Sequence, residues 1–486
     1  MIQGSYFSIP LTEPVCATRR RIPLVIASRS PRPARWRSVL VLAAVPVIDA
    51  VINQINTIYQ PPIGPFSMLQ VARGTMLAVI LGIAVAGGRP PDRVSRAVGR
   101  IVLIVTICLA IFVVREFSVR GELLMSTLVP STQIVYCLLM WYVATCSIRD
   151  PKSGAAVIKG LLLGAVLTAA SVYYGYATGM ATVPYTLVGA TASSGFFVSG
   201  KGIAGTLDAA ALLAAYFSYR RRTWPLLAIA LLCLGASFLT YARAGLVALG
   251  AALTWLAIWS IGTRLKSQSS WVRRLLLVIA CGVGILICTV GTGDLARRWS
   301  DLQNPEKAGS GRLVLWSAAL ERFYEGSPSE QLIGNGFQSM YEFTYGLVGA
   351  AIHTHNDVVD MLFVGGVVGL LALALVYAGV VVQIRSSAIR SPEAATAVAV
   401  LVVLMYQGFF TGQLLLPDVM ANYFLAITAV LACRSLPLTP YAWGNFIHSK
   451  KGWERVREYE LAIRLAKKPV DIQSALSYPD SRDRIR

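Results

Sequence analysis

The chain has 486 residues, of which 55% are hydrophobic and 14% charged, with a formal net charge of +20 and a mean hydropathy of +0.61. Soluble proteins carry about 25% charged residues, so this composition, with repeated apolar runs of about 20 residues, excludes a soluble protein and indicates a bilayer. The positive charge falls in short clusters between the apolar runs, which is typical of membrane topology and argues against a nucleic-acid partner.

We predict an all-α fold class, a polytopic integral membrane protein of about 12 transmembrane helices with one large periplasmic loop. The basic segment 1–37 precedes the first apolar run, which lies too far from the start and is too long for an ordinary cleaved signal peptide. The predicted spans are 38–57, 66–87, 97–115, 129–147, 154–177, 203–218, 224–241, 243–262, 274–292, 357–384, 395–413 and 417–434.

The positions of Lys and Arg predict the orientation of these spans. Every connection on the proposed inner side carries at least two positive charges, as the positive-inside rule requires. Both termini are therefore expected in the cytoplasm. The predicted organisation is a cytoplasmic basic arm (1–37), helices 1–9 (38–292), a periplasmic loop forming the rim of an active site (293–356), helices 10–12 (357–434) and a cytoplasmic basic tail (435–486).

Two outer segments differ in character. Residues 178–202 are rich in Gly, Ser and Thr, whereas the 293–356 loop is longer and mixed in charge. Within that loop, apolar side chains recur at helical spacing and predict an amphipathic helix near the membrane surface, formed on Leu313, Trp316, Leu320 and Phe323. A glycine-containing turn is expected to follow at 332–337.

A polar segment, residues 353–357, lies where the loop meets a long apolar helix, and it contains two of the three histidines in the chain. A neutral imidazole at His355 can accept a proton near pH 7, which suits a general base. The alternative is a structural role at the helix start, which Asn356 and Asp357 fit equally well.

A metal site is the other reading of the His353/His355 pair. It needs a third ligand, for which only Asp357, Asp360 or a distant carboxylate is at hand, so we predict none. The eight cysteines include no CxxC pair and none in the 293–356 loop, which argues against a disulfide framework or a thiolate zinc site.

Several cationic residues are expected on the outer side. Arg243 lies in a tight turn between two spans, where it either faces a wet cavity or an anion, or extends to the lipid head groups. Arg312 opens the loop helix, where its guanidinium either binds phosphate oxygens or is a solvated surface charge. Arg73 and Lys201 add positive charge to the outer half. The acids inside spans, Asp49 and Asp208, are expected in structural ion pairs.

Together these groups fit an anionic lipid-linked substrate better than a water-soluble one. A pyrophosphate leaving group needs cations to hold its developing charge, which a metal-free enzyme supplies from Arg and Lys. An acceptor hydroxyl needs a base within hydrogen-bond reach. The chain has no serine-nucleophile elbow, Walker loop, HExxH or dinucleotide-binding fingerprint in a fitting context.

Three stretches resemble the O-antigen ligase-like superfamily, which includes Wzy-type polysaccharide polymerases and WaaL-type ligases. The first is the span turn at Tyr241–Gly245. The second joins Arg312–Trp316 to the turn at Gly334–Phe337. The third is His355–Asp357, followed by the glycine-containing stretch Gly365–Gly369, which we expect to allow close helix packing.

The resemblance implies metal-independent, inverting glycosyl transfer on the periplasmic side of a bacterial inner membrane, without a cofactor. The donor would be an undecaprenyl-pyrophosphate-linked oligosaccharide and the partner a glycan acceptor, within membrane lipid and beside other assembly proteins such as a flippase or a chain-length regulator. His355 would activate the acceptor hydroxyl, and Arg243 and Arg312 would hold the pyrophosphate. Further substrate-binding candidates are Lys201, Arg73, His353 and Asn356.

Three alternatives accompany this prediction. A polymerase is favoured over a ligase that transfers the glycan to a lipid A core. A transporter or flippase of the lipid-linked glycan would also suit twelve spans and a cationic cavity, but it does not require the large outer loop. The third alternative is a non-catalytic assembly subunit whose tail binds partners.

Overall fold

The computed structural model describes most of the helical part of the chain. The predicted span at 274–292, nearly all of the N-terminal arm and the C-terminal tail lie outside the described residues. The described ranges are 33–59, 62–63, 66–86, 92–122, 125–179, 182–185, 190–193, 200–221, 223–240, 242–262, 312–349, 352–387, 391–414 and 416–435.

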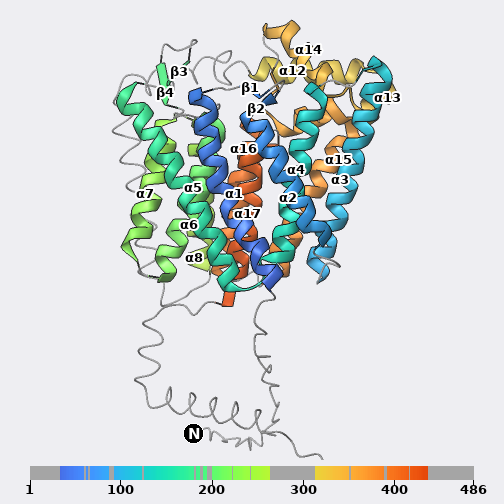
Figure 1. The fold of residues 1–486 in the computed structure, drawn as a ribbon. Helices are drawn as coiled ribbons and strands as arrows, with labels where there is room; N and C mark the ends of the chain where they lie inside the picture. The colour runs from blue at the N-terminus through green and yellow to red at the C-terminus, as the bar shows by residue number, and fades with distance from the viewer. Residues whose placement is uncertain are drawn as a thin grey trace, which may run out of the picture.

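A bundle of long helices forms the body of the protein (Figure 1). Within the described ranges these helices coincide with the predicted spans to within a few residues, which confirms the helical class. They are α1 (Pro33–Tyr59), α2 (Met68–Ala86), α3 (Arg93–Arg120), α4 (Met125–Ser147), α5 (Pro151–Thr178), α6 (Gly200–Arg221), α7 (Trp224–Leu239), α8 (Arg243–Gly262), α15 (Asp357–Ser386), α16 (Pro392–Thr411) and α17 (Pro417–Ala432), with the 3₁₀ turn η2 (Cys433–Ser435) after the last.

Six helices in the described part are long and apolar enough to cross a membrane, which supports a multi-pass membrane protein. They are Trp36–Ile55, Arg93–Arg120, Met125–Ser147, Pro151–Thr178, Asp357–Ser386 and Pro392–Thr411. Five shorter apolar helices accompany them, within α2, α6, α7, α8 and α17. The total of twelve spans stays a prediction.

Short polar residues set where several helices begin. Asp92 caps α3 by accepting a hydrogen bond from the backbone N–H of Ser95, and Asp150 caps α5 in a reciprocal capping box with Ser153. These caps satisfy N–H groups that have no partner inside the helix, so they fix the ends of the apolar runs.

Two short antiparallel hairpins are the part of the fold that the helical prediction omitted. Strand β1 (Pro62–Ile63) pairs with β2 (Phe66–Ser67), and β3 (Thr182–Tyr185) pairs with β4 (Ala190–Ser193). The second hairpin falls within the 178–202 segment, which is rich in Gly, Ser and Thr.

The core joins helices that are distant in the sequence. Helix α17 packs against α4, α5, α6 and α16. Trp141 of α4 stacks on Phe424 of α17 with ring centroids 5.0 Å apart, and its indole N–H donates to Gln383 Oε1 of α15 at 2.8 Å. A buried indole needs such a partner for its N–H, so this contact fixes α4 between α15 and α17.

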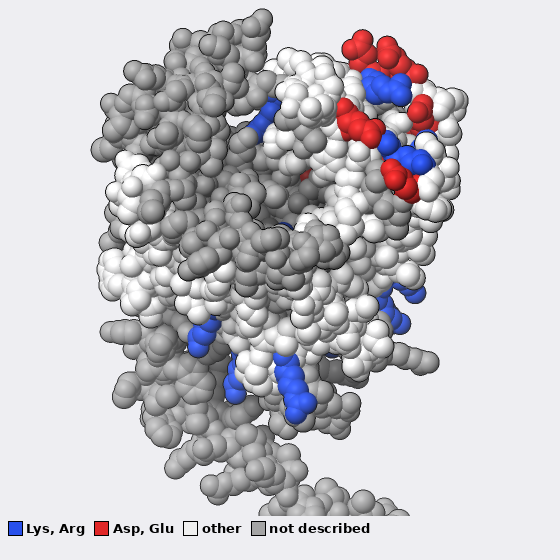
Figure 2. Space-filling model, turned by 45° about the horizontal axis from the view of Figure 1, so that its top comes forward, with Lys and Arg blue, Asp and Glu red and all other residues white. Residues whose placement is uncertain are grey.

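One end of the bundle, here called the loop end, carries three further helices (Figure 1). They are α12 (Arg312–Glu325), α13 (Pro328–Ile333) and α14 (Phe337–Val348). Helix α12 confirms that this stretch is helical, but its buried side chains are Leu315 and Ala319, whereas Leu313 of the predicted apolar face is exposed. Charged side chains of both signs gather on one side of the loop end, whereas the described charged side chains visible toward the opposite end are basic (Figure 2). That the loop end faces the periplasm stays a prediction.

Helix α15 is broken at Gly366, which has φ 59° and ψ −152°, so the predicted span at 357–384 is not one continuous helix. The break is stabilised by the predicted turn between α13 and α14. The backbone N–H of Asn335 donates to the carbonyl of Phe363 at 2.8 Å, and that of Gly336 donates to Val364 at 3.0 Å. The turn thereby satisfies two carbonyls near the break.

Glycine is required at both sides of this contact. A Cβ at Gly366 would lie 2.5 Å from the carbonyl oxygen of Gln331, and one at Gly334, where φ is 81°, would collide with the backbone of Val364. The 334–336 turn and the upper part of α15 therefore pack backbone against backbone.

Candidate active site

The polar segment 352–356 connects α14 to α15 at the loop end, and its last residue caps the helix. Asn356 Oδ1 accepts hydrogen bonds from the backbone N–H groups of Val358 at 2.9 Å and Val359 at 3.2 Å. Asn356 is buried. This confirms its suggested role as a helix cap, while binding of substrate by Asn356 stays a prediction.

Asp360, one turn into α15, reaches back to organise the same segment. Its Oδ1 accepts from the backbone N–H of Thr354 at 2.7 Å, and its Oδ2 lies 3.2 Å from His353 Nδ1. The same Nδ1 lies 3.1 Å from the backbone nitrogen of His355. A protonated Nδ1 donates to Asp360, whereas an unprotonated Nδ1 accepts from His355. His353 is therefore held between a carboxylate and the backbone of the second histidine.

His355 adopts a left-handed backbone conformation with φ 62°, alone among the non-glycine residues that the structure describes. This conformation costs on the order of 1–3 kcal/mol and persists only where the surroundings enforce it. Here the enforcement comes from the two neighbouring residues, since Thr354 is held by Asp360 and Asn356 is the cap. The imidazole is only partly buried, and its ring packs edge-on against that of His353 with centroids 4.3 Å apart.

The connection between α16 and α17 forms the floor beneath the histidines. A Cβ at Gly412 would lie 2.8 Å from His353 Cε1 and 3.3 Å from the backbone carbon of His355. Buried Asp357 fixes this connection, because its Oδ1 accepts from the backbone N–H groups of Gln413 at 2.7 Å and Leu414 at 2.9 Å. Its other oxygen, Oδ2, has no hydrogen-bond partner among the described residues.

A chain of buried polar side chains continues from this floor into the bundle. Gln413 Nε2 donates to Thr411 Oγ1 at 2.6 Å and to Gln407 Oε1 at 3.2 Å. Gln407 Nε2 in turn donates to Asp208 Oδ2 at 3.2 Å, and Ser237 Oγ donates to Asp208 Oδ1 at 2.8 Å. Within the described structure an amide and a hydroxyl bind this carboxyl group, and the ion pair predicted for Asp208 stays a prediction.

Helix α12 brings Arg312 to the same place. Its guanidinium donates to the carbonyl of Phe410, near the C-terminal end of α16. One turn further along α12, the indole N–H of Trp316 donates to the carbonyl of Thr354 at 2.9 Å. Helix α12 is thus joined to the C-terminal end of α16 through Arg312 and to the histidine segment through Trp316.

The comparison with known families bears on this part of the chain. Residues 227–374 match the O-antigen ligase family model (Wzy_C). The matched stretch begins in α7 and ends within α15, so it includes Arg312 and both histidines. It supports assignment of the chain to the O-antigen ligase-like superfamily, as an enzyme of the glycosyltransferase-like ligases and polymerases. No curated protein matches the chain.

The remaining cationic candidates are less closely defined. Lys201 lies in α6 and Arg243 begins α8, but the side chains of both lie outside the described part of the structure. The start of α8 is nevertheless near the polar chain, since a Cβ at Gly245 would lie 3.0 Å from Asp208 Oδ2. Arg73 lies on α2, which packs against α1 and α4.

No metal site is assembled by the residues that the structure describes. No group of three or more His, Cys, Asp or Glu side chains in those ranges is placed to hold a metal ion. Of the carboxylates named as third ligands, Asp360 contacts His353, whereas Asp357 binds the α16–α17 connection.

Sequence reasoning missed the buried partners of the site. Thr411 and Gln413 lie at the end of the predicted span 395–413 and are 54 or more residues after Asp357 in the sequence, so no local pattern relates them to it. The position of Asp360 in the sequence did indicate that this residue has a partner. Its spacing from Asn356 and Asp357 puts three polar residues in the first turn of an apolar helix, which is unexpected unless each has a partner.

Proposed function

We propose that the protein is a membrane glycosyltransferase that polymerises oligosaccharide repeat units carried on a polyisoprenyl pyrophosphate, with the site at the loop end and the loop end facing the periplasm. The observation that supports the proposal is that α12 bonds the C-terminal end of α16 through Arg312 and the carbonyl of Thr354, next to His355, through Trp316. Helix α12 and both histidines lie within the stretch that matches the O-antigen ligase family. A cation and a partly buried imidazole are the two groups that such a transfer needs.

In this proposal His355 acts as the general base. It takes the proton of the acceptor hydroxyl while that oxygen forms a bond to the anomeric carbon of the donor. The bond from the anomeric carbon to the pyrophosphate oxygen breaks on the opposite face, so the configuration inverts and the lipid pyrophosphate leaves. Arg312 and Arg243 stabilise the charge that develops on the leaving oxygen. Lys201 and Arg73 are proposed to hold the remaining phosphate charge.

The backbone of His355 supports its assignment as the reacting group. Strained residues cluster at functional sites, where the strain holds a side chain in a working position. The contacts from Asp360, Asn356 and Trp316 all secure the flanking backbone and leave the imidazole partly exposed. His353, bound to Asp360, is better suited to positioning His355 than to accepting the substrate proton.

The test is transfer by purified protein from a synthetic lipid-pyrophosphate-linked oligosaccharide. We expect a ladder of products with added repeat units, insensitive to a metal chelator. One product with an added lipid A core would instead identify a ligase. Both His355→Ala and His355→Gly are expected to abolish transfer. The glycine variant relieves the left-handed strain, so it separates loss of the imidazole from damage to the backbone.

A matched pair on α12 tests the arginine. Arg312→Ala is expected to lower transfer by at least about a hundredfold, the loss seen when one group stabilising a developing oxyanion is removed. Glu321→Ala changes an exposed residue on the same helix and should leave transfer unchanged. Normal product length from the His355→Gly and Arg312→Ala proteins would refute the proposal.

A further inference from the structure

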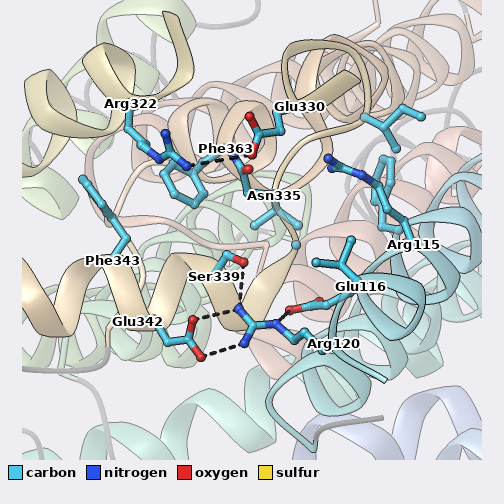
Figure 3. A pocket seen from close by; sticks show the side chains of 15 residues that line it. Arg115, Glu116, Arg120, Arg322, Glu330, Asn335, Ser339, Glu342, Phe343 and Phe363 are labelled. Atoms are coloured by element: carbon cyan, nitrogen blue, oxygen red, sulfur yellow. Dashed lines mark hydrogen bonds and ion pairs between the residues drawn. The ribbon is translucent and has the colours of Figure 1, made fainter. Parts of the chain in front are cut away.

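A cavity of about 490 Å³ opens at the loop end between α3, α12, α13, α14 and α15 (Figure 3). Its size lies within the range of about 300–1,000 Å³ typical of small-ligand sites. The residues already assigned to the candidate active site do not line it. Its wall includes Phe112, Arg115, Arg322, Asn335, Phe343 and Phe363.

Two of the three carboxylates of this cavity, Glu116 and Glu342, bind other groups of the protein. Glu116, buried on α3, accepts from the backbone N–H groups of Phe337 at 3.1 Å and Gln338 at 2.8 Å, and so caps α14 from a neighbouring helix. Arg120 binds both oxygens of Glu342, at 2.8 and 2.7 Å, and also donates to Ser339 at 2.9 Å. The contacts of Arg120 with Glu342 and Ser339 lie in the lower half of the view in Figure 3.

The opposite side of the cavity carries side chains whose hydrogen-bonding groups are not all satisfied by described residues. Arg115 is half-buried and makes no ion pair or hydrogen bond with any described residue, and Arg322 reaches Glu330 only at 3.8 Å. The side-chain amide of Asn335 has no partner among those residues either. In Figure 3, Arg322, Glu330, Asn335 and Arg115 lie around the upper part of the cavity.

The charges in the cavity wall balance. Three arginines and three glutamates line it, so its formal charge is zero and it offers no excess of cations for a polyanion. Hydrogen bonds from Ser327, with Arg322 and Arg115 nearby, lower the pKa of Glu330, which therefore stays ionised as an acceptor. The wall thus presents guanidinium and amide donors beside a carboxylate acceptor, as a ligand rich in hydroxyl groups requires.

Aromatic side chains supply the apolar part of the surface. Phe343 is partly exposed and packs against buried Phe363, with ring centroids 5.2 Å apart. Flat rings beside charged and amide groups match the apolar face and hydroxyl edges of a pyranose. A phosphate or lipid headgroup would have no use for the aromatic face.

The cavity is also close to the candidate active site. Phe363 follows Asp357 by six residues on the same helical segment, a rise of about 9 Å at 1.5 Å per residue. The 334–336 turn, which lines the cavity, is hydrogen-bonded to that segment. A saccharide that fills the cavity therefore lies a short distance from His355, at the same end of the bundle.

We propose that this cavity binds uncharged sugar residues of a glycan chain, separately from the group that reacts at His355. The inference rests on the proposed function, in which a transferase must hold the glycan that accepts or donates the reacting unit. Arg115, Asn335 and Arg322 supply the hydrogen bonds to hydroxyl groups, and Phe343 supplies the apolar contact.

The experiment measures binding without turnover. Detergent-purified full-length His355→Ala protein is mixed with neutral oligosaccharides of two to four hexoses, and saturation-transfer difference NMR detects bound sugar. Oligogalacturonides of the same lengths and inorganic pyrophosphate serve as competitors. We expect signal from the neutral sugars that neither competitor removes at equal concentration. Because the protein lacks His355, the result does not depend on whether that residue acts as the base.

Three variants locate the binding. Arg115→Ala and Asn335→Ala, each in the His355→Ala protein, are expected to weaken the signal at least fivefold, and thermal unfolding of each confirms that it remains folded. Arg96→Gln lies on the same helix α3, outside the cavity wall, and should retain the full signal. Absence of signal, equal signal from both cavity variants and the Arg96→Gln control, or displacement by pyrophosphate would overturn the proposal.

Discussion

Asp357 offers a sharp test of how the histidine segment is held over the α16–α17 connection. Its Oδ1 accepts from two backbone N–H groups, those of Gln413 and Leu414, in a buried position. Asp357→Ala leaves both donors unsatisfied. Each buried donor without a partner costs about 1–3 kcal/mol, so the expected loss is about 2–6 kcal/mol. Against a typical total stability of about 5–15 kcal/mol, this is a large fraction.

Asp357→Asn is the matched control. It retains an oxygen acceptor at the Oδ1 position and places its amide at Oδ2, which has no hydrogen-bond partner among the described residues. The loss is limited to the charge contribution to two hydrogen bonds and to one buried amide without a partner, which we expect to cost about 1–3 kcal/mol. Thermal unfolding of purified protein in detergent should therefore rank the wild type above Asp357→Asn and place Asp357→Ala well below both.

The expected size of the shift follows from the same accounting. At about 2 °C per kcal/mol, Asp357→Ala lowers the unfolding midpoint by about 4–12 °C and Asp357→Asn by about 2–6 °C. Transfer activity should follow the same order, because the connection forms the floor under His353. Equal midpoints for the alanine and asparagine variants would show that these hydrogen bonds do not hold the site together.

Three further predictions concern the loop end. Gly334→Ala should lower the unfolding midpoint by several degrees, because a Cβ there collides with α15, whereas Gly346→Ala, with open space around it, should not. Trp316→Phe should cost about 1 kcal/mol by removing one hydrogen bond, and should lower transfer without changing the amount of inserted protein. The hydrogen bond from Arg120 lowers the pKa of Glu342 in the folded protein. Protection of the α14 amides from hydrogen exchange should therefore persist below the ordinary glutamate pKa, and decline only as the pH falls through the pKa of Glu342 in the folded protein. Decline already between pH 6 and 5 would contradict this.

The positions of the helices followed from the sequence because each long apolar run needs its own backbone hydrogen bonds in a bilayer. The same reasoning located α12, whose apolar face shows a helical period. It failed at the break in α15. Gly365 and Gly366 in an apolar helix indicate close packing, and only the contact with the 334–336 turn, about thirty residues earlier, reveals that the helix is interrupted.

Site residues could be predicted where their type is rare in a membrane protein. Residues that act through partners distant in the sequence could not be predicted. His355 and Arg312 stood out because histidine is scarce in this chain and because a cation begins the amphipathic helix. Glu116 gave no such signal. It lies near the end of α3, where a charged residue is unremarkable, yet it caps α14 across 221 residues of sequence.

The contact between the 334–336 turn and α15 decides which part of the loop end can move. Because two backbone hydrogen bonds join them, α14 and the upper segment of α15 are expected to move as one body. Helix α12 is joined to the bundle differently, through side chains of Arg312 and Trp316, and it is separated from α13 by a bend at Gly326. A swing of α12 about that bend would withdraw both side chains together and open the histidine segment to a bulky chain. The same swing would carry Arg322 out of the cavity wall, so the sides formed by α3, α13, α14 and α15 would remain while the α12 side opened.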